Sequence, residues 1–234
     1  MKVVILCGGL GSRLAEETKL IPKPMVKIGK VPIVQHIINF YESYGFQDFI
    51  LATGYKKEFL ERYFKKNKRV KCIFTGKNTL TGGRLLRLKN YFSKDENFFL
   101  TYGDGLSNQN LKNLVKFHSK HKKIATLTAV RPTARFGELK ILKNKVKKFQ
   151  EKPQLKDNWI NGGFFIFNKK IFNYISGDKM MLEREPFLKL TKQNELMAFK
   201  HYGFWQCMDT MRDKNVLSKL WKEKKAPWIK KQKY

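Results

Sequence analysis

The chain alternates between short apolar runs and longer amphipathic segments. The apolar runs are rich in β-branched and aromatic residues, as strands buried on both faces of a sheet are. They cover residues 2–7, 49–53, 70–74, 98–102, 124–130 and 164–167. Segments with apolar residues at helical spacing lie between them, at 33–41, 58–64, 84–92 and 111–118. This alternation predicts βαβ units and a parallel sheet.

In the second half of the chain the predicted strands are shorter and the alternation of strands and helices is less regular. Shorter strands are expected at 138–141 and 146–149, and helices at 170–175, 183–193 and 213–221. We therefore predict an α/β protein with a Rossmann-like, doubly wound, mostly parallel mixed sheet flanked by helices. Since no internal repeat or low-complexity linker interrupts the pattern, residues 1–228 are expected to form one domain, followed by a basic tail at 229–234.

Composition narrows the class of protein. Hydrophobic residues make up 42% of the 234 residues, which is too much apolar material for a disordered chain. Because no apolar run approaches the roughly 18 residues that span a bilayer, no membrane insertion is expected. The three cysteines are odd in number and far apart, so a disulfide scaffold is not expected and a cytoplasmic location is predicted.

The charge is strongly basic, with 49 Lys or Arg against 19 Asp or Glu and a formal net charge of +30. Such a charge attracts phosphate groups of any kind. However, the lysines are spread along the whole chain, and no helix-turn-helix, zinc-finger or RNA-recognition motif accompanies them. A lysine-rich solvated surface is therefore favoured over a groove for a specific nucleic acid.

Two clusters near the N-terminus suit phosphate chemistry. The first, Gly8-Gly9-Leu10-Gly11-Ser12-Arg13, directly follows the first strand. Backbone amides of such a loop can bind phosphate oxygens, and Arg13 can bridge two of them; the alternative is a tight structural turn with an exposed arginine. The second is Lys23, whose neighbours Pro22 and Pro24 restrict where its ammonium can point. A lysine held in this way suits a transferring phosphoryl group.

Two aspartates are candidates for holding Mg²⁺. Asp104 stands between two glycines directly after a buried strand, and Asp209 could supply a second carboxylate. Mg²⁺ prefers one or two carboxylates together with phosphate oxygens. The alternatives are structural: Asp104 as a turn residue that caps the helix near Asn110, and Asp209 as the N-cap of the helix that Asp213 enters.

Taken together, these motifs resemble a known family. The first loop, with Pro22-Lys23-Pro24-Met25, is similar to the signature of the sugar-1-phosphate nucleotidyltransferases. Further segments resemble the branch of that family that uses CTP and glucose 1-phosphate, and the resemblance spans residues 1 to about 228. The segments that carry it include Thr81-Gly82-Gly83-Arg84, Tyr102-Gly103-Asp104-Gly105, Glu151-Lys152-Pro153, Asn161-Gly162-Gly163, Glu183-Arg184-Glu185-Pro186 and Trp205-Gln206-Cys207-Met208-Asp209-Thr210.

The resemblance implies a role for each matching position. Arg13 and Lys23 would be catalytic, neutralising charge around the α-phosphorus, and Asp104 and Asp209 would hold Mg²⁺. The nucleotide would be bound by Leu6, Gly8, Gly9, Gly11, Ser12, Thr81, Gly82, Gly83 and Gly103, with Arg84 also lying along it. The sugar phosphate would be bound by Glu151, Lys152, Asn161 and Gly162.

The implied reaction is transfer of a cytidylyl group from CTP to glucose 1-phosphate, giving CDP-glucose and pyrophosphate for bacterial surface-polysaccharide synthesis. A homo-oligomer is also expected. One alternative is a related enzyme that uses UTP, dTTP, GTP or another phosphorylated substrate, and another is a non-catalytic nucleotide-sugar-binding module. The chain departs from the branch between Tyr63 and Thr81, where it is shorter and basic.

Overall fold

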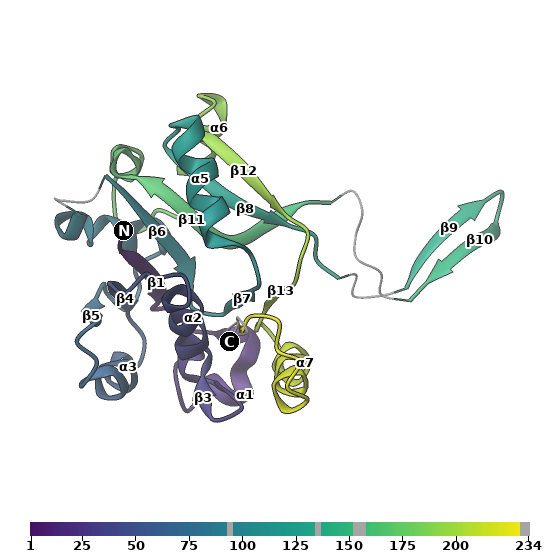
Figure 1. Ribbon diagram of the computed structural model, residues 1–234, viewed down its shortest axis with the longest axis horizontal. Coiled ribbons are helices and arrows are strands. Elements are labelled where there is room, and N and C mark those ends of the chain that lie inside the picture. The colour runs from purple at the N-terminus through teal and green to yellow at the C-terminus, as the bar shows by residue number, and fades with distance from the viewer. Residues whose placement is uncertain (93–95, 134–136, 152–157, 230–234) are drawn as a thin grey trace.

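A seven-stranded mixed sheet forms the centre of the molecule (Figure 1). The computed structural model describes residues 1–92, 96–133, 137–151 and 158–229. The strand order is β12-β8-β11-β6-β1-β4-β5. The strands are β1 (Val3–Cys7), β4 (Phe49–Thr53), β5 (Val70–Phe74), β6 (Asn97–Tyr102), β8 (Ala125–Val130), β11 (Ile160–Asn168) and β12 (Leu196–His201). Only β11 runs antiparallel to its described neighbours, which confirms the predicted mostly parallel mixed sheet.

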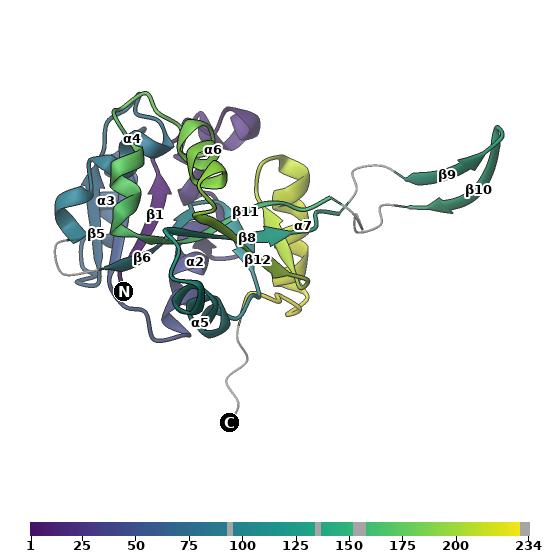
Figure 2. The same ribbon diagram turned by 90° about the horizontal axis from the view of Figure 1, so that it is seen from above.

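Helices cover both faces of this sheet (Figures 1 and 2). Alternate residues of β1 show why: Val3 and Ile5 belong to one buried apolar cluster and Val4 to a second one on the opposite face. The first cluster includes apolar residues of α2 (Ile33–Glu42), α3 (Lys57–Phe64), α5 (Leu111–His121) and α7 (Met211–Lys222). The second includes residues of α4 (Thr81–Leu86) and α6 (Glu185–Lys192). The predicted doubly wound arrangement is thus confirmed.

Short elements connect the sheet to the loops at its edge. After β1 come a 3₁₀ turn η1 (Ser12–Leu14), α1 (Ala15–Thr18), a second turn η2 (Lys23–Met25) and the small pair β2 (Lys27–Ile28) and β3 (Val31–Pro32). A further pair, β7 (Gly105–Ser107) with β13 (Trp205–Cys207), joins the segment after β6 to the segment before α7. This pair draws together two loops that are a hundred residues apart in the sequence.

Several predicted elements differ from the observed ones. The helix expected at 84–92 is two pieces, α4 and a 3₁₀ turn η3 (Lys89–Phe92), and the helix expected at 170–175 is a 3₁₀ helix η4 (Lys169–Tyr174). Helix α4 begins earlier because its glycines lie against a distant loop: a Cβ added at Gly83 would stand 2.5 Å from the carbonyl oxygen of Asp178. Strands β7, β12 and β13 were not predicted.

A separate β-hairpin projects away from the sheet (Figures 1 and 2). It consists of β9 (Glu138–Leu142) and β10 (Lys145–Gln150), which confirms the two short strands predicted there. The pairs Leu139–Phe149 and Ile141–Val146 lie on one face of it, and all four side chains are more than half exposed. We call these four residues the apolar hairpin face. An isolated two-stranded hairpin is at best marginally stable in water, so this face is unusual for a free surface.

The chain returns to the core near its C-terminus. Trp228 is buried and donates a hydrogen bond from Nε1 to Nδ1 of His36 at 3.3 Å. Of the predicted basic tail, only Ile229 lies within the described residues. Within the described residues, no helix has both the length and the apolar character needed to cross a membrane.

Candidate active site

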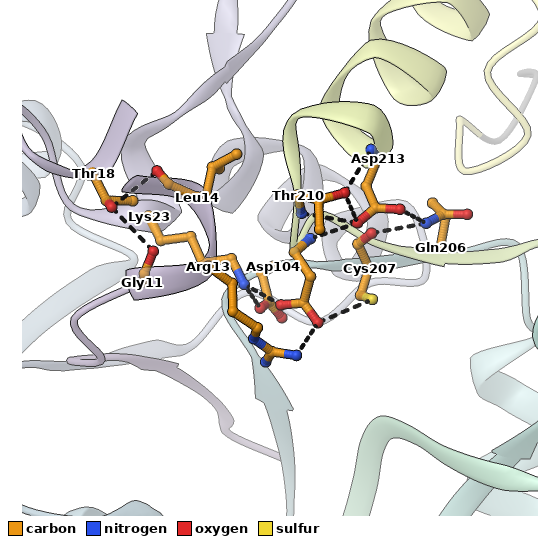
Figure 3. Close-up of polar contacts among 11 residues, drawn as sticks. Gly11, Arg13, Leu14, Thr18, Lys23, Asp104, Gln206, Cys207, Thr210 and Asp213 are labelled. Carbon is orange, nitrogen blue, oxygen red and sulfur yellow. Dashed lines mark hydrogen bonds and ion pairs between the residues drawn. The ribbon is translucent and has the colours of Figure 1, made fainter. Parts of the chain in front are cut away.

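Four side chains singled out from the sequence meet at the carboxyl edge of the central strands (Figure 3). The ammonium nitrogen of Lys23 lies 2.5 Å from Oδ2 of Asp104 and 2.5 Å from Oδ1 of Asp209. Arg13 contacts the other oxygen of Asp209 at 2.8 Å. These residues come from the loop after β1, the turn after β6 and the segment before α7, so the fold gathers them from three distant parts of the sequence.

Backbone contacts hold Asp104 in this position. The amide of Gly103 donates to the carbonyl of Leu6 at 3.1 Å, which continues the pairing of β6 with β1 beyond the strand. The carbonyl of Asp104 accepts a hydrogen bond from the amide of Met208 at 2.8 Å. The suggested alternative, that Asp104 caps the helix near Asn110, is wrong, because the Asn110 side chain itself caps α5.

The start of α7 leaves Asp209 available to the cations. Thr210 is the N-cap, and it forms a capping box with Asp213. Asp213 also accepts hydrogen bonds from the Asp209 amide at 3.1 Å and from Nε2 of Gln206 at 2.9 Å. The alternative in which Asp209 is the N-cap is therefore wrong, and its carboxylate faces Lys23 and Arg13 instead (Figure 3).

The charges in this cluster stabilise one another. Burial alone would lower the pKa of Lys23, but Asp104 and Asp209 outweigh that effect and the pKa is raised. Burial would raise the pKa of Asp209, but the hydrogen bond and charge of Lys23, with the charge of Arg13, hold it below its usual value. The Asp209 carboxylate therefore stays ionised and Lys23 stays protonated at neutral pH.

The donor set fits a magnesium ion. Two carboxylate oxygens from different loops converge on one point, which the Lys23 ammonium occupies in this structure. A metal held by both carboxylates would take that place and release Lys23 towards a substrate phosphate. Hard oxygen ligands of this kind, completed by phosphate and water, suit Mg²⁺. Among the described residues, no cluster gathers three or more His, Cys, Asp or Glu as potential ligands, so a metal bound here would depend on substrate or water for its remaining ligands.

The Arg84 side chain holds the start of the glycine-rich loop through the carbonyl of Gly8. It is buried, and it donates hydrogen bonds to the carbonyls of Gly8 at 2.8 Å, Gly76 at 2.7 Å and Thr53 at 3.1 Å. Burial lowers the pKa of its guanidinium. Because these carbonyls belong to the segments after β1, β4 and β5, one side chain ties three strand ends together. Arg84, expected to lie along the nucleotide, does line the smaller cavity, but nothing in the sequence marks its structural role.

Two cavities flank the charged cluster. The smaller, about 400 Å³, is lined by most of the residues predicted to bind the nucleotide, namely Leu6, Gly8, Gly9, Gly11, Ser12, Thr81 and Gly103. The larger, about 620 Å³, is lined by the predicted sugar-binding residues Asn161 and Gly162, with Trp205 and Asp209. Arg13, Tyr102 and Asp104 line both cavities. A ligand in each would therefore meet the other at the charged cluster.

Some predicted site residues lie elsewhere. Gly82 and Gly83 do not line either cavity; they pack against the backbone of Met180 and Asp178. Glu151 is exposed at the end of β10 and lines neither cavity. Lys152 lies outside the described residues.

Glu183 and Tyr102 are site residues to which the sequence analysis gave no role. Glu183 lines the smaller cavity and accepts hydrogen bonds from the hydroxyls of Thr81, at 2.6 Å, and Tyr102. Burial, and then the Glu183 charge, raise the pKa of Tyr102, so that its hydroxyl keeps its proton. Both residues stand in segments that resemble the family, but nothing local marks them as partners.

Comparison with known proteins agrees with this geometry. Residues 2–212 match the model of a family described as nucleotidyl transferase. The chain belongs to this family. It is 46% identical to a glucose-1-phosphate cytidylyltransferase of Salmonella typhimurium, over 97% of this chain and 98% of that protein. It is 40% identical to a probable glucose-1-phosphate cytidylyltransferase of Bacillus subtilis, over 97% and 99% of the two chains.

Solved structures of other members share the fold. HddC from Yersinia pseudotuberculosis, complexed with GMP-PN, superposes with a TM-score of 0.75 at 27% identity, covering 94% of this chain and 99% of that one. The resemblance to sugar-1-phosphate nucleotidyltransferases deduced from the motifs is thus confirmed, and the protein is a nucleotidyltransferase.

Proposed function

We propose that this nucleotidyltransferase transfers a cytidylyl group from CTP to glucose 1-phosphate, giving CDP-glucose and pyrophosphate for surface-polysaccharide synthesis. The observation that carries the proposal is the charged cluster of Arg13, Lys23, Asp104 and Asp209 between two cavities. The names of the two relatives, each matched over nearly its whole length, favour CTP and glucose 1-phosphate over other pairs.

The chemistry demands positioning more than proton transfer. An oxygen of glucose 1-phosphate attacks the α-phosphorus of CTP, the bond to the β-phosphate oxygen breaks, and pyrophosphate leaves in line. The attacking phosphate is already anionic, so no general base is needed. The obstacle is the approach of two polyanions, which fixed cations overcome by neutralising charge in a preorganised site.

Each residue of the cluster has a part in that approach. The loop of Gly8 to Arg13 would bind the CTP phosphates in the smaller cavity, while Asn161 and Gly162 would bind the hexose in the larger one. Lys23 and Arg13 would hold the anionic oxygens at the boundary. Asp104 and Asp209 would hold Mg²⁺, which when bound supplies further neutralisation of the phosphate charge.

The direct test is an assay of nucleotide choice. The purified chain is incubated with Mg²⁺, glucose 1-phosphate and one of CTP, UTP, dTTP or GTP, and both pyrophosphate and nucleotide sugar are measured. We expect the highest kcat/KM with CTP. A preference for another triphosphate would contradict the cytidylyl assignment, and binding of nucleotide sugar without any turnover would identify a non-catalytic module.

We also propose that the protein forms a homo-oligomer through the apolar hairpin face. Support comes from its four exposed apolar side chains on a hairpin that is too small to be stable alone. A second copy is the favoured occupant because a symmetric interface pairs the same patch from each molecule.

A further inference from the structure

Tyr102 forms the wall that the two cavities share. It is the last residue of β6 and lines both the smaller and the larger cavity. On one side its ring packs against Gly163, where φ is +75° and an added Cβ would stand 2.4 Å from Cδ2 of Tyr102. Glycine at this position is required by both the backbone conformation and the close approach of the ring. The ring therefore has a fixed support on the side of β11.

Glu183 fixes the hydroxyl end of the same wall. One carboxylate oxygen accepts a hydrogen bond from the Tyr102 hydroxyl, and the other accepts a hydrogen bond from Oγ1 of Thr81 at 2.6 Å. Thr81 in turn accepts a hydrogen bond from the amide of Leu182 at 2.9 Å. Since each carboxylate oxygen has its own donor, the orientation of Glu183 is set, and α4 is joined to the end of β6.

The same hydroxyl also contacts Asn161, a residue that lines the larger cavity. Because the single O–H of Tyr102 donates its hydrogen bond to Glu183, the hydroxyl oxygen can still accept one, and Nδ2 of Asn161 donates to it at 3.4 Å. The amide oxygen of Asn161 accepts from the backbone amide of Gly163 at 2.9 Å. These two contacts fix which end of the Asn161 amide faces Tyr102, and they leave one N–H for a hydroxyl of the ligand.

We propose that Glu183 is a positioning residue that sets both substrate pockets at once, through Thr81 for the nucleotide and through the Tyr102 hydroxyl and Asn161 for the hexose. This inference rests on the proposed function. Glu183 lies outside the charged cluster, so its effect falls on how the substrates are held. Loss of one well-placed hydrogen bond to a bound substrate weakens binding by about tenfold.

The proposal is tested by measuring, for each variant, the KM for CTP and the KM for glucose 1-phosphate separately. Tyr102→Phe keeps the ring and removes the hydroxyl, so the KM for glucose 1-phosphate should rise about tenfold while the KM for CTP stays within about twofold. Glu183→Ala should raise both values, and Glu183→Gln, which keeps one acceptor, should recover part of the loss. In the double variant, the KM for glucose 1-phosphate should be no higher than in Glu183→Ala alone, because both changes break one chain of contacts.

The matched control is Glu185→Gln, which removes a carboxylate two residues away that pairs with Lys189 on the surface. Its kinetics should equal those of the unsubstituted chain. Effects of Tyr102→Phe and Glu183→Ala that multiply, or an unchanged KM for glucose 1-phosphate in Tyr102→Phe, would overturn the proposal. If the unsubstituted chain makes no nucleotide sugar, the proposed function fails instead, and calorimetric binding of each substrate then tests the same separation without turnover.

Discussion

Lys23 and Asp104 are separated by 81 residues, yet the ammonium of one lies 2.5 Å from the carboxylate of the other. The pairing places a positive charge between two carboxylates, those of Asp104 and Asp209, at the boundary of two cavities. Lys23 contacts both carboxylates, so the cluster should respond strongly to the loss of any one of the three groups.

Lys23→Ala and Asp104→Asn should each abolish formation of the nucleotide sugar while the protein stays folded. The first removes a cation needed by two anionic substrates, and the second weakens the proposed metal site; either should lower kcat/KM by about a thousandfold. Pyrophosphate release measures the loss of activity, and circular dichroism checks that each variant is folded. Lys27→Ala is the control, because it removes an exposed lysine four residues away. Near-normal turnover in either variant would refute that residue's role.

Asp209→Asn should raise the Mg²⁺ concentration required for half-maximal activity by about tenfold, since one of two carboxylate ligands is lost. Activity of the unsubstituted chain should vanish with a chelator and return with Mg²⁺. The control Asp178→Asn removes an exposed carboxylate that pairs with Arg87. An identical Mg²⁺ requirement in Asp209→Asn and the unsubstituted chain would exclude this residue as a ligand.

Gly8→Ala should destabilise the protein and weaken nucleotide binding. The new Cβ would stand 2.1 Å from a guanidinium nitrogen of Arg84, which is buried and tied to three strand ends. We expect a loss of about 1–3 kcal/mol in the free energy of unfolding, typical of overpacking. Gly9→Ala is a close control, because nothing lies within 4 Å of a Cβ at that position. Urea denaturation of both variants measures the difference, and equal stabilities would contradict the account of Arg84.

The folded state should lose stability as the pH falls from 7 to 4, and His118 should account for much of the loss. His118 lies on α5 and is buried against Thr126 of β8. Burial, and then the nearby His121, lower its pKa from the usual 6.5 to about 4. The unfolded chain therefore binds more protons than the folded one in this window, so stability falls with pH. The full pKa shift corresponds to a loss of about 3 kcal/mol in the free energy of unfolding.

His118→Asn can keep the hydrogen bond to Thr126, which is 2.8 Å long in the protein, without a titrating ring. Its free energy of unfolding should depend less on pH than that of the unsubstituted chain. Lys120→Gln, on the exposed side of the same helix, should leave the slope unchanged. The same pH slope in His118→Asn and the unsubstituted chain would show that other groups cause the loss.

Phe149→Lys should reduce the oligomer to a smaller species, because it places a charge in the apolar hairpin face. Leu188→Lys is the matched control: Leu188 is 63% exposed against 61% for Phe149, but it lies on α6, away from the hairpin. Light scattering after size-exclusion chromatography measures the mass of each variant. A monomeric unsubstituted chain, or an oligomer that survives Phe149→Lys unchanged, would refute this interface.

Local sequence patterns predicted the strands that are buried on both faces of the sheet. They failed to predict elements whose formation depends on contacts with residues far away in the sequence. Strand β12 was missed because it is an edge strand with partly exposed residues, and its pairing with β8 is the main sign of it. Helix α4 has two glycines in its first turn, which local propensity disfavours, and contacts with the backbone of Asp178 and Met180 compensate. Propensity along the chain carries no information about that loop.

The site was predicted in the same uneven way. Arg13, Lys23, Asp104 and Asp209 stand out locally in the sequence. The meeting of the first three follows from the shared edge of the parallel strands β1 and β6, whereas the pairing of β7 with β13 brings Asp209 to them. The capping of α7 by Thr210 and Asp213 and the contact of Glu183 with Tyr102 depend on side-chain direction across loops. No spacing in the sequence encodes those directions.

The projecting hairpin has a consequence for how the protein responds to salt. Two copies that meet through the apolar hairpin face each carry a net charge of +30 and repel one another. Added ions screen that repulsion and so favour the assembly, while they weaken the attraction of the same surface for anionic substrates. Under the proposed assembly, a dilute preparation in low salt would therefore dissociate first, and added salt would shift it back towards the oligomer while weakening substrate binding.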